Sequence, residues 1–544
     1  KTQNFTSSTS AHNTAVGYSA GELITTGIKN TIVGGLAGDA ITTGNENTAV
    51  GMSALGATTT GAQNTAIGQG SLQANTTASQ NTAVGYSALN VNTTGDAIVA
   101  IGALAADANT TGGDFVAIGH GALGANTTGS FNVAMGRNAM SANTTGAGNV
   151  AMGRRALQAN TTADNNTAIG RDALLANTTG ATNVAVGVDA LAANTTAANN
   201  TAVGYASARG NTTGTDNVSL GSASLTANTT GNSNTAIGRL ALDANTTGDE
   251  NTATGKGSLQ ANTTADNNTA VGSGALGDTT TGANNTAVGR TALNKNTTGD
   301  QNVAVGTDAL DANTTGTRNH AFGMEALTDC TTGNNNTALG HTAMRNVTTG
   351  TDNIAIGYNS APSATTGTNN ISIGLSAAPD MTTGRFNLCI GANTVGNVLT
   401  TGEFNIYQGY LARAGSSGAV GEIVLSSGNR LSTGKGNSTG FIDANIGGVY
   451  QGNNSSSWST TSDRRIKKNI EDNNTGLDAI NQIRIRNFEY RTKDEITEVT
   501  SDAAIGKEGV QLGVIAQEIE TILPDVVKEE STGVKSVNPD NLTW

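Results

Sequence analysis

Small apolar and polar residues recur along most of this chain with a 17-residue period. The unit reads N-[TV]-A-[VI]-G-x-x-A-L-x-A-N-T-T-G-x-x, and we number its leading Asn as position 1. It starts at Asn13 and recurs in phase to Asn387, which gives 23 copies, all with Gly at position 5. Position 4 is apolar except at Thr254, and position 9 is usually Leu. These two positions hold the only sizeable apolar residues, so the pattern predicts short strands around a thin core.

The length of the unit decides the class of repeat fold. Such a unit is too short for a helix pair or a propeller blade, but it suffices for one β-solenoid coil of short strand, turn, second stretch and turn. We therefore predict a mainly β fold, with a lead-in over residues 1–12 and a parallel β-solenoid of 17-residue coils over 13–403. At about 4.8 Å per coil, the rod is on the order of 110 Å long.

Several positions of the unit bear on packing. Side chains at positions 4 and 9 are expected inside the coil. Position 3 is almost always Ala, which would let several chains approach a common axis, and one thin coil buries little surface, so we predict a homotrimer. Gly at position 5 and Gly or Ala at position 15 indicate either a positive φ or close backbone approach. Ala78 and Ala163 weaken the first interpretation at position 15.

Composition and charge exclude several classes of function. The 544 residues include only 18 aromatic residues and 13% charged residues, which excludes conventional thick cores for most of the chain. The net charge of −13 argues against nucleic acid as a partner, because phosphate backbones are bound by clustered Lys and Arg. No apolar run is long enough to cross a bilayer, so no membrane insertion is expected. Because the sequence starts at Lys1 without Met, we expect a fragment or a processed product.

The repeats offer little for catalysis or for a cofactor. The four His residues, His12, His120, His320 and His341, are scattered over different coils, so neither a metal site nor another cofactor is predicted. Asp and Glu fall mostly at variable positions, without the recurrent pairing of a glycosidase. Cys330 and Cys389 lie too far apart for a disulfide and are expected to be free thiols.

The repeated ANTT segment permits three interpretations. Its Asn-x-Ser/Thr sequons would be glycosylated in a eukaryotic secreted protein, and its Thr arrays could bind ice. Asn tolerates left-handed turns and its side chain bonds local backbone, which favours a stacked ladder of Asn and Thr side chains. Consecutive Thr residues in a strand point to opposite faces, which argues against ice binding.

The pentapeptides NTAVG and FVAIG, each followed by x-x-A, resemble the repeats in head domains of trimeric autotransporter adhesins. The resemblance covers residues 13 to about 403 and implies left-handed β-rolls assembled as a trimer. The unit in this chain is longer than the family's typical unit by an ANTTG turn.

Residues 404–461 carry 6 of the 18 aromatic residues. Because aromatic side chains bury a large area at low entropic cost, this segment is either a recognition tip or a local core where the repeat ends. We predict receptor contacts by Tyr407, Tyr410, Phe441, Tyr450 and Trp458. The polar stretch GNNSSSWSTTSD at the end of the segment is typical of an exposed linker.

Residues 462–544 form a different domain, which holds 27 of the 69 charged residues of the chain. Leu477, Ile480 and Ile483 recur at helical spacing, RIRNFEY alternates as a strand does, and a second helix with Ile515 and Ile519 stops near Pro524. We predict a small α+β unit.

Two motifs of this domain, SDRRIKKNI from Ser462 and GVIAQEIETILPDVV from Gly513, closely resemble the self-cleaving intramolecular chaperone of phage tailspikes and fibres, the endosialidase type. The resemblance implies a catalytic dyad of Ser462 and Lys467 and cleavage between Ser462 and Asp463. It also implies C-terminal truncation, since that family usually continues into a coiled-coil helix.

Elementary chemistry agrees with this dyad. A Ser hydroxyl is a poor nucleophile until a base takes its proton, and Lys467 can be that base once burial or cationic neighbours lower its pKa. Arg464, Arg465 and Lys468 are such neighbours. The alternative is that SDRRIKKN is only a solvated basic run.

The repeats and the chaperone-like domain are explained by one hypothesis. Slipping one chain of a trimer by one coil changes contacts only at the ends, so the rod needs a separate module to set its register. We predict a phage tail fibre, assembled in the host cytoplasm and carried on the virion, that binds a host-surface glycan or protein and other tail proteins. Self-cleavage is the only expected reaction. The alternatives are a bacterial trimeric surface adhesin and a polysaccharide-degrading tailspike.

Overall fold

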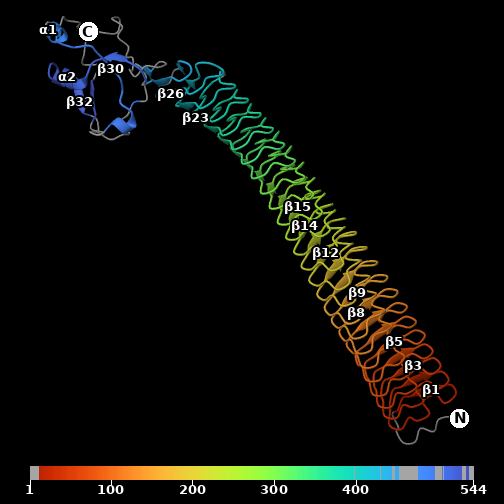
Figure 1. The fold of residues 1–544 in the computed structure, drawn as a ribbon. Coiled ribbons are helices and arrows are strands. Elements are labelled where there is room, and N and C mark those ends of the chain that lie inside the picture. Colours follow the sequence, from red (N-terminus) through yellow and green to blue (C-terminus); the bar gives the residue numbers. More distant parts are fainter. Residues whose placement is uncertain are drawn as a thin grey trace. The chain divides into compact units, whose positions relative to one another are not determined.

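The structure is a computed structural model that describes residues 11–396, 398–428, 431–443, 448–451, 476–496, 505, 508–529 and 534–537. The chain forms two compact units, Lys1–Thr460 and Thr461–Trp544. The first unit is a stack of coils in which one short strand follows the next in chain order (Figure 1). The predicted fold class, mainly β with a parallel solenoid of 17-residue coils and a small α+β C-terminal region, is confirmed.

Each of the 23 coils contributes one short strand at positions 2–4 of the unit. Every strand pairs in parallel with the next at a shift of one repeat unit, as Thr14 pairs with Thr31. The strands are β1 (Thr14–Val16), β2 (Thr31–Val33), β3 (Thr48–Val50), β4 (Thr65–Ile67), β5 (Thr82–Val84), β6 (Val99–Ile101), β7 (Val116–Ile118), β8 (Val133–Met135), β9 (Val150–Met152), β10 (Thr167–Ile169), β11 (Val184–Val186), β12 (Thr201–Val203), β13 (Val218–Leu220), β14 (Thr235–Ile237), β15 (Thr252–Thr254), β16 (Thr269–Val271), β17 (Thr286–Val288), β18 (Val303–Val305), β19 (His320–Phe322), β20 (Thr337–Leu339), β21 (Ile354–Ile356), β22 (Ile371–Ile373) and β23 (Leu388–Ile390).

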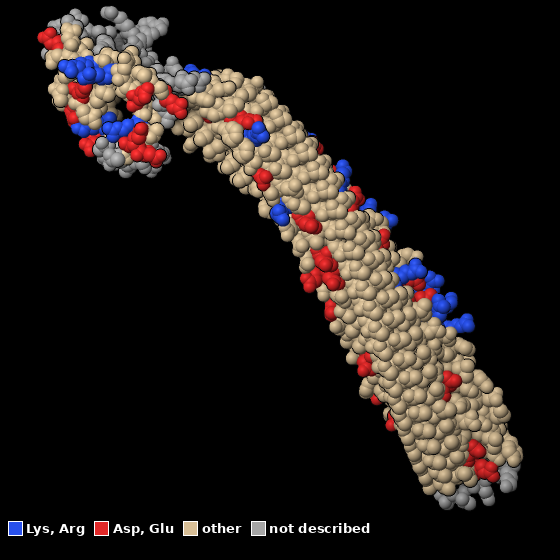
Figure 2. Space-filling view, in the orientation of Figure 1, with Lys and Arg blue, Asp and Glu red and all other residues tan. Residues whose placement is uncertain are grey.

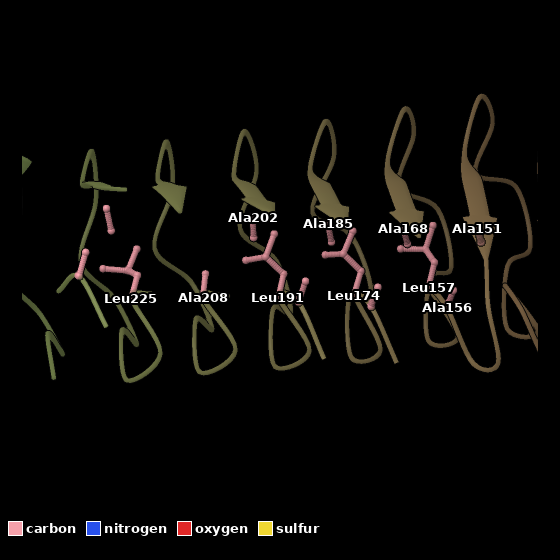
Figure 3. Close-up of a cluster of buried hydrophobic side chains, with 14 of the residues drawn as sticks. Ala151, Ala156, Leu157, Ala168, Leu174, Ala185, Leu191, Ala202, Ala208 and Leu225 are labelled. Atoms are coloured by element: carbon pink, nitrogen blue, oxygen red, sulfur yellow. The ribbon is translucent and has the colours of Figure 1, made fainter. Parts of the chain in front are cut away.

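The interior of the coil is narrower than the sequence pattern indicated. Ala at position 3 points inward and is fully buried, as at Ala168, where it faces the Leu of position 9 (Figure 3). Since side chains alternate across a strand, positions 2 and 4 point outward. The expectation that position 4 fills the core is therefore wrong, and so is the expectation that Ala at position 3 lines an axis between chains. In most coils the interior is filled by Ala at positions 3 and 8, Leu at position 9 and the buried Asn side chains of positions 1 and 12.

The corners of the coil depend on left-handed backbone. Positions 7, 9 and 17 have positive φ in most coils, even where position 9 is a buried Leu such as Leu157. At position 5 both a positive φ and close backbone approach require Gly. Gly204 has a φ of +135°, and a Cβ there would collide with the carbonyl oxygen of Gly221. At position 15 only close approach applies, because the Gly residues there, such as Gly214, lack a positive φ.

The ANTT segment forms the predicted ladder. At position 12 most of the Asn amides donate to the Asn of the preceding coil, as Asn126 Nδ2 does to Asn109 Oδ1 at 2.8 Å. The same amide donates to the carbonyl oxygen of Gly129 in its own coil at 2.9 Å. At position 13 the Thr42 hydroxyl donates to the carbonyl oxygen of Thr59. These position-12 Asn side chains are fully buried, which closes them to glycosylation.

The last coils depart from the repeat. β24 (Ile406–Gln408) pairs with β23 one position later than the period requires, and β26 (Ile423–Ser426) and β28 (Gly440–Asp443) continue the parallel sheet. β25 (Ala412–Arg413) and β27 (Ser432–Thr433) form a second parallel pair. β29 (Gly448–Gln451) then pairs antiparallel with β28, so the run of parallel strands ends there.

The second unit contains short elements of mixed type. Its helices are α1 (Gly476–Ile480), η2 (Lys493–Glu495), α2 (Ala516–Glu520) and η4 (Pro524–Val526). Two antiparallel pairs join β30 (Arg486–Phe488) to β31 (Gln511–Gly513) and β32 (Val527–Glu529) to β33 (Lys535–Val537). The two predicted helices and the predicted strand are present, and α2 ends before Pro524 as expected.

Candidate assembly surface

The outward face of the long parallel sheet carries a continuous apolar row. Position 4 is Val, Ile, Leu, Met or Phe in every coil but one, and many of these side chains remain open to solvent, with Leu339 48% and Phe322 40% exposed. Position 2 is Thr or an apolar residue such as Val218 and Ile354, except for His320 in β19. We call positions 2 and 4 together the outer sheet face.

The size of the outer sheet face is unusual for an isolated chain. At about 4.8 Å per coil and roughly 10 Å in width, 23 coils present on the order of 1,000 Å². The largest apolar patch on a typical monomer covers a few hundred Å², about 300–600. The outer sheet face is therefore a strong candidate for contact with other chains.

A buried carboxylate organises the end of the rod. Glu422 is fully buried and accepts hydrogen bonds from the Tyr407 hydroxyl at 2.8 Å and from the backbone N–H groups of Gly415 and Gly436 at 3.0 and 2.7 Å. Burial and the adjacent Glu422 carboxylate raise the pKa of Tyr407. Gly434 passes so close to this carboxylate that a Cβ there would collide with it.

The five residues expected to contact a receptor fall into different surroundings. Tyr407 is fully buried at the inward position of β24, so its assignment as a receptor contact is wrong. Tyr410 is 46% exposed, and Phe441 lies half-buried with the Lys435 ammonium 4.9 Å from its ring centroid. The backbone of Tyr450 pairs with that of Phe441 in the antiparallel end of the sheet, and Trp458 lies outside the described residues.

The C-terminal unit also exposes apolar side chains. Leu512 in β31 is 74% exposed, and Val510 and Ile485, which flank the β30–β31 pair, are 66% and 61% exposed. Strand alternation places all three on the same face of this pair. Within the described part of the unit, only Ile519 and Val526 are buried apolar residues. The unit thus exposes more large apolar side chains than it buries.

Two ion pairs join α2 to other elements of the described unit, Lys535–Glu520 to β33 and Arg486–Glu518 to β30. The Arg486 guanidinium on β30 donates to both carboxylate oxygens of Glu518 on α2, at 3.1 and 2.8 Å. The pair lowers the pKa of Glu518 and raises the pKa of Arg486. It fixes α2 beside the strand pair through a bidentate contact.

The predicted cleavage machinery lies outside the described residues. This applies to Ser462, Asp463, Arg464, Arg465, Lys467 and Lys468. The dyad and its basic neighbours therefore stay predictions.

The described residues contain no group of three or more His, Cys, Asp and Glu side chains that could hold a metal ion. In the same residues no helix has the length and apolar character to cross a membrane. Cys330 and Cys389 are buried free thiols in different coils, and burial raises the pKa of each to about 12.

Sequence reasoning missed two features of this surface. The outer sheet face could have been found from the alternation in T-A-V, because a middle residue that points inward forces both neighbours outward. Glu422 follows the position-1 residue Asn405 by one full repeat and so takes the place of the buried Asn. A charged residue in the place of this repeated Asn was the sequence signal for the buried carboxylate.

Comparison with known proteins adds one match. Residues 462–528 match the model of the peptidase S74 family, described as the chaperone of endosialidase. No curated protein and no solved structure matches the chain. A chaperone domain of this kind, next to a long parallel solenoid, implies a fibre- or tailspike-type protein that assembles as a trimer.

Proposed function

We propose that this chain is a homotrimeric tail fibre of a virion, and that residues 462–544 are an intramolecular chaperone that is cut off after assembly. The rod, residues 13–403, is the shaft of the fibre. Residues 404–461 form its tip and the linker to the chaperone. A host-surface glycan or protein is the target, and other tail proteins hold the fibre on the particle.

The chaperone match at residues 462–528 carries this proposal. The same hydrogen bonds recur from coil to coil, as in Thr31 N–H to Asn47 O and Thr48 N–H to Asn64 O, both 2.8 Å. Contacts that repeat in every coil cannot set the register of one chain against another. A unit with its own unrepeated contacts can set it, and removal of that unit afterwards leaves a rod that can no longer dissociate and re-register by the same route.

Ser462 and Lys467 perform the cleavage. The Lys467 amine takes the proton of the Ser462 hydroxyl, and Arg464, Arg465 and Lys468 lower the pKa of that amine by charge repulsion. The Ser462 oxygen then attacks the carbonyl carbon of Ser462 itself, and the bond to the Asp463 nitrogen breaks as that nitrogen takes the proton from the Lys467 amine. Water hydrolyses the resulting ester, which restores the Ser462 hydroxyl, leaves a carboxylate on Ser462 and releases residues 463–544.

Expression of the full chain tests the proposal. Mass spectrometry should find two pieces that meet at the Ser462–Asp463 bond, and Ser462→Ala and Lys467→Ala should remain whole. Lys468→Ala is the matched control, since it removes a neighbouring charge but leaves the dyad, and it should still be cut. Persistent cleavage in both dyad variants, or single chains by light scattering, would refute the proposal.

Binding to host cells separates the fibre from the alternatives. A mature rod that binds whole cells or surface glycans, and loses that binding with Tyr410→Ala or Trp458→Ala, supports a receptor-binding fibre. Release of soluble sugar from a surface polysaccharide would instead identify a polysaccharide-degrading tailspike.

A further inference from the structure

We propose that the outer sheet face is where two further copies of this chain pack, all pointing in the same direction, and that the charged borders of this face set that direction. The inference rests on the proposed homotrimer and adds to it the contacting surface and the polarity. It assigns one occupant, a second copy of this chain, to the apolar row.

The border at position 6, which follows each strand, carries positive charge. None of the 23 coils has Asp or Glu at this position, although the chain as a whole is acidic. All the cationic side chains of this row are exposed. They are Arg137, Arg154, Arg171, Arg239, Lys256 and Arg290.

The border at positions 16 and 17, which precedes each strand, carries negative charge. It holds eleven acidic residues and only three basic ones, Lys29, Arg318 and Arg385. The acidic residues are Glu46, Asp96, Asp114, Asp164, Asp216, Asp249, Glu250, Asp266, Asp300, Asp352 and Glu403. Figure 2 shows Lys and Arg gathered along one side of the rod, whereas Asp and Glu lie on the other side and also among the Lys and Arg.

Most of the position-6 cations form no ion pair with a described acidic residue of their own chain, although the charge of Arg154 helps to lower the pKa of Asp172. Within the described part of the chain, Arg137, Arg154, Arg239 and Lys256 form no ion pair, and Arg171 comes only within 4.0 Å of Asp172. Arg290 is the exception, since it contacts Asp308 at 3.0 Å. The cationic border is therefore available to a neighbouring molecule.

Carboxylates of the acidic border are also exposed to a neighbouring molecule. At position 16 one oxygen of Asp164 accepts the backbone N–H of Ala147 at 2.7 Å, and Asp300 accepts that of Ala283 at the same distance. These bonds orient the carboxylates along the rod, and both side chains stay exposed.

Because the two borders carry opposite charge, they favour one relative direction of neighbouring chains. When copies are related by rotation about an axis along the rod, the cationic border of each copy lies against the acidic border of the next. When two copies run in opposite directions, like borders meet, which is unfavourable over many coils. The two borders therefore favour parallel chains, in which the apolar rows meet at the axis.

Thiol cross-linking tests this arrangement in the full chain. Val33→Cys and Ile373→Cys place a thiol at position 4 near opposite ends of the rod, and a short bis-maleimide would join neighbouring chains. Because each chain then carries one accessible thiol and the reagent joins two, we expect each variant alone to give covalent dimers on a denaturing gel. Ala202→Cys at the inward position 3 is the control and should stay unlinked, as should the native thiols, which are buried with pKa values of about 12.

The outcomes separate this inference from the proposed function. Trimers by light scattering whose position-4 thiols stay unlinked would overturn the surface assignment and leave the fibre proposal intact. Links that appear only when the two variants are mixed would show antiparallel chains and overturn the polarity. Single chains by light scattering would overturn both proposals.

Charge reversal tests the borders directly. Arg137→Glu with Arg154→Glu should lower the trimer fraction at least fivefold at low salt, whereas Arg209→Glu with Lys295→Glu, at positions 10 and 11, should leave it unchanged. An unchanged trimer fraction in the first variant would overturn the role of the borders. The same holds if that variant stays trimeric and only loses retention on a heparin column, because the cations would then serve an outside polyanion.

Discussion

The rod and the C-terminal unit achieve order in opposite ways. The rod repeats the same backbone and Asn contacts from coil to coil, around an interior of Ala, Leu and Asn. The C-terminal unit holds 27 of the 69 charged residues and uses contacts that occur once, such as the Arg486–Glu518 pair between residues 32 positions apart. The repeated contacts stabilise the rod but do not define the register of one chain against another. The unrepeated contacts of the C-terminal unit can define that register, although the unit buries little surface.

This difference predicts where a substitution acts. A repeat protein behaves as a one-dimensional array in which each coil contacts mainly its neighbours, so damage in one coil should stay local. Damage to the exposed face of the C-terminal unit should instead affect assembly of the whole molecule. Four substitutions or conditions, ordered by expected effect, test this contrast.

The largest effect is expected from Leu512→Asp. This exposed side chain lies on the apolar face of the β30–β31 pair, so a charge there should block chain association without unfolding the unit. We expect trimer yield by light scattering to fall at least tenfold. Gln517→Asp adds the same charge at an exposed site on α2 and should assemble normally. A fully trimeric Leu512→Asp would contradict the expected role of the C-terminal unit in assembly.

A coil-corner substitution, Gly204→Ala, should come next. Its φ of +135° and the nearby carbonyl oxygen of Gly221 leave no room for a methyl group, so we expect a local loss of about 2–4 kcal/mol. Hydrogen exchange should rise in the adjoining coils and not at the rod ends. Gly214→Ala at position 15 is the matched control, because four other coils carry Ala there, and it should cost less.

Interruption of the buried ladder by Asn211→Ala should cost about 1–3 kcal/mol, because a buried amide loses its acceptor. Asn228 Nδ2 donates to Asn211 Oδ1 at 2.7 Å in the native coil. The natural ends of the ladder support this reasoning, since Asn262 Oδ1, which precedes Thr279, has no hydrogen-bond partner. Asn211→Thr should cost less, and equal exchange rates in both variants would count against a ladder.

The smallest effect is expected from acid. The Arg486 side chain lowers the pKa of Glu518 below its ordinary value of 4.5. The pair therefore stabilises the unit at pH values above that ordinary pKa, and its contribution is lost as pH falls through the lowered folded pKa. The thermal midpoint of the C-terminal unit should fall slightly between pH 6 and pH 3, and Glu518→Gln should flatten that dependence.

The period alone was enough to predict the solenoid, its parallel pairing and the Asn ladder. One repeat unit fits one coil, and identical turns stacked on one another bring equal side chains together. The face of each strand was assigned wrongly, because the pattern T-A-V fixes alternation but not which set points inward. The closed coil decides that, since it places position 3 inside, where the usual Ala packs beside the Leu of position 9.

The candidate surface followed only in part from the sequence. The resemblance of two motifs to a known family located the chaperone region and implied its proposed dyad, whereas the burial of Tyr407 against Glu422 required the stacked end of the rod. By itself, then, the sequence determined the repeat, the domain order and the distribution of charge. Tertiary structure decided which apolar row is left outside, because only the closed coil shows that position 3 points inward and position 4 outward.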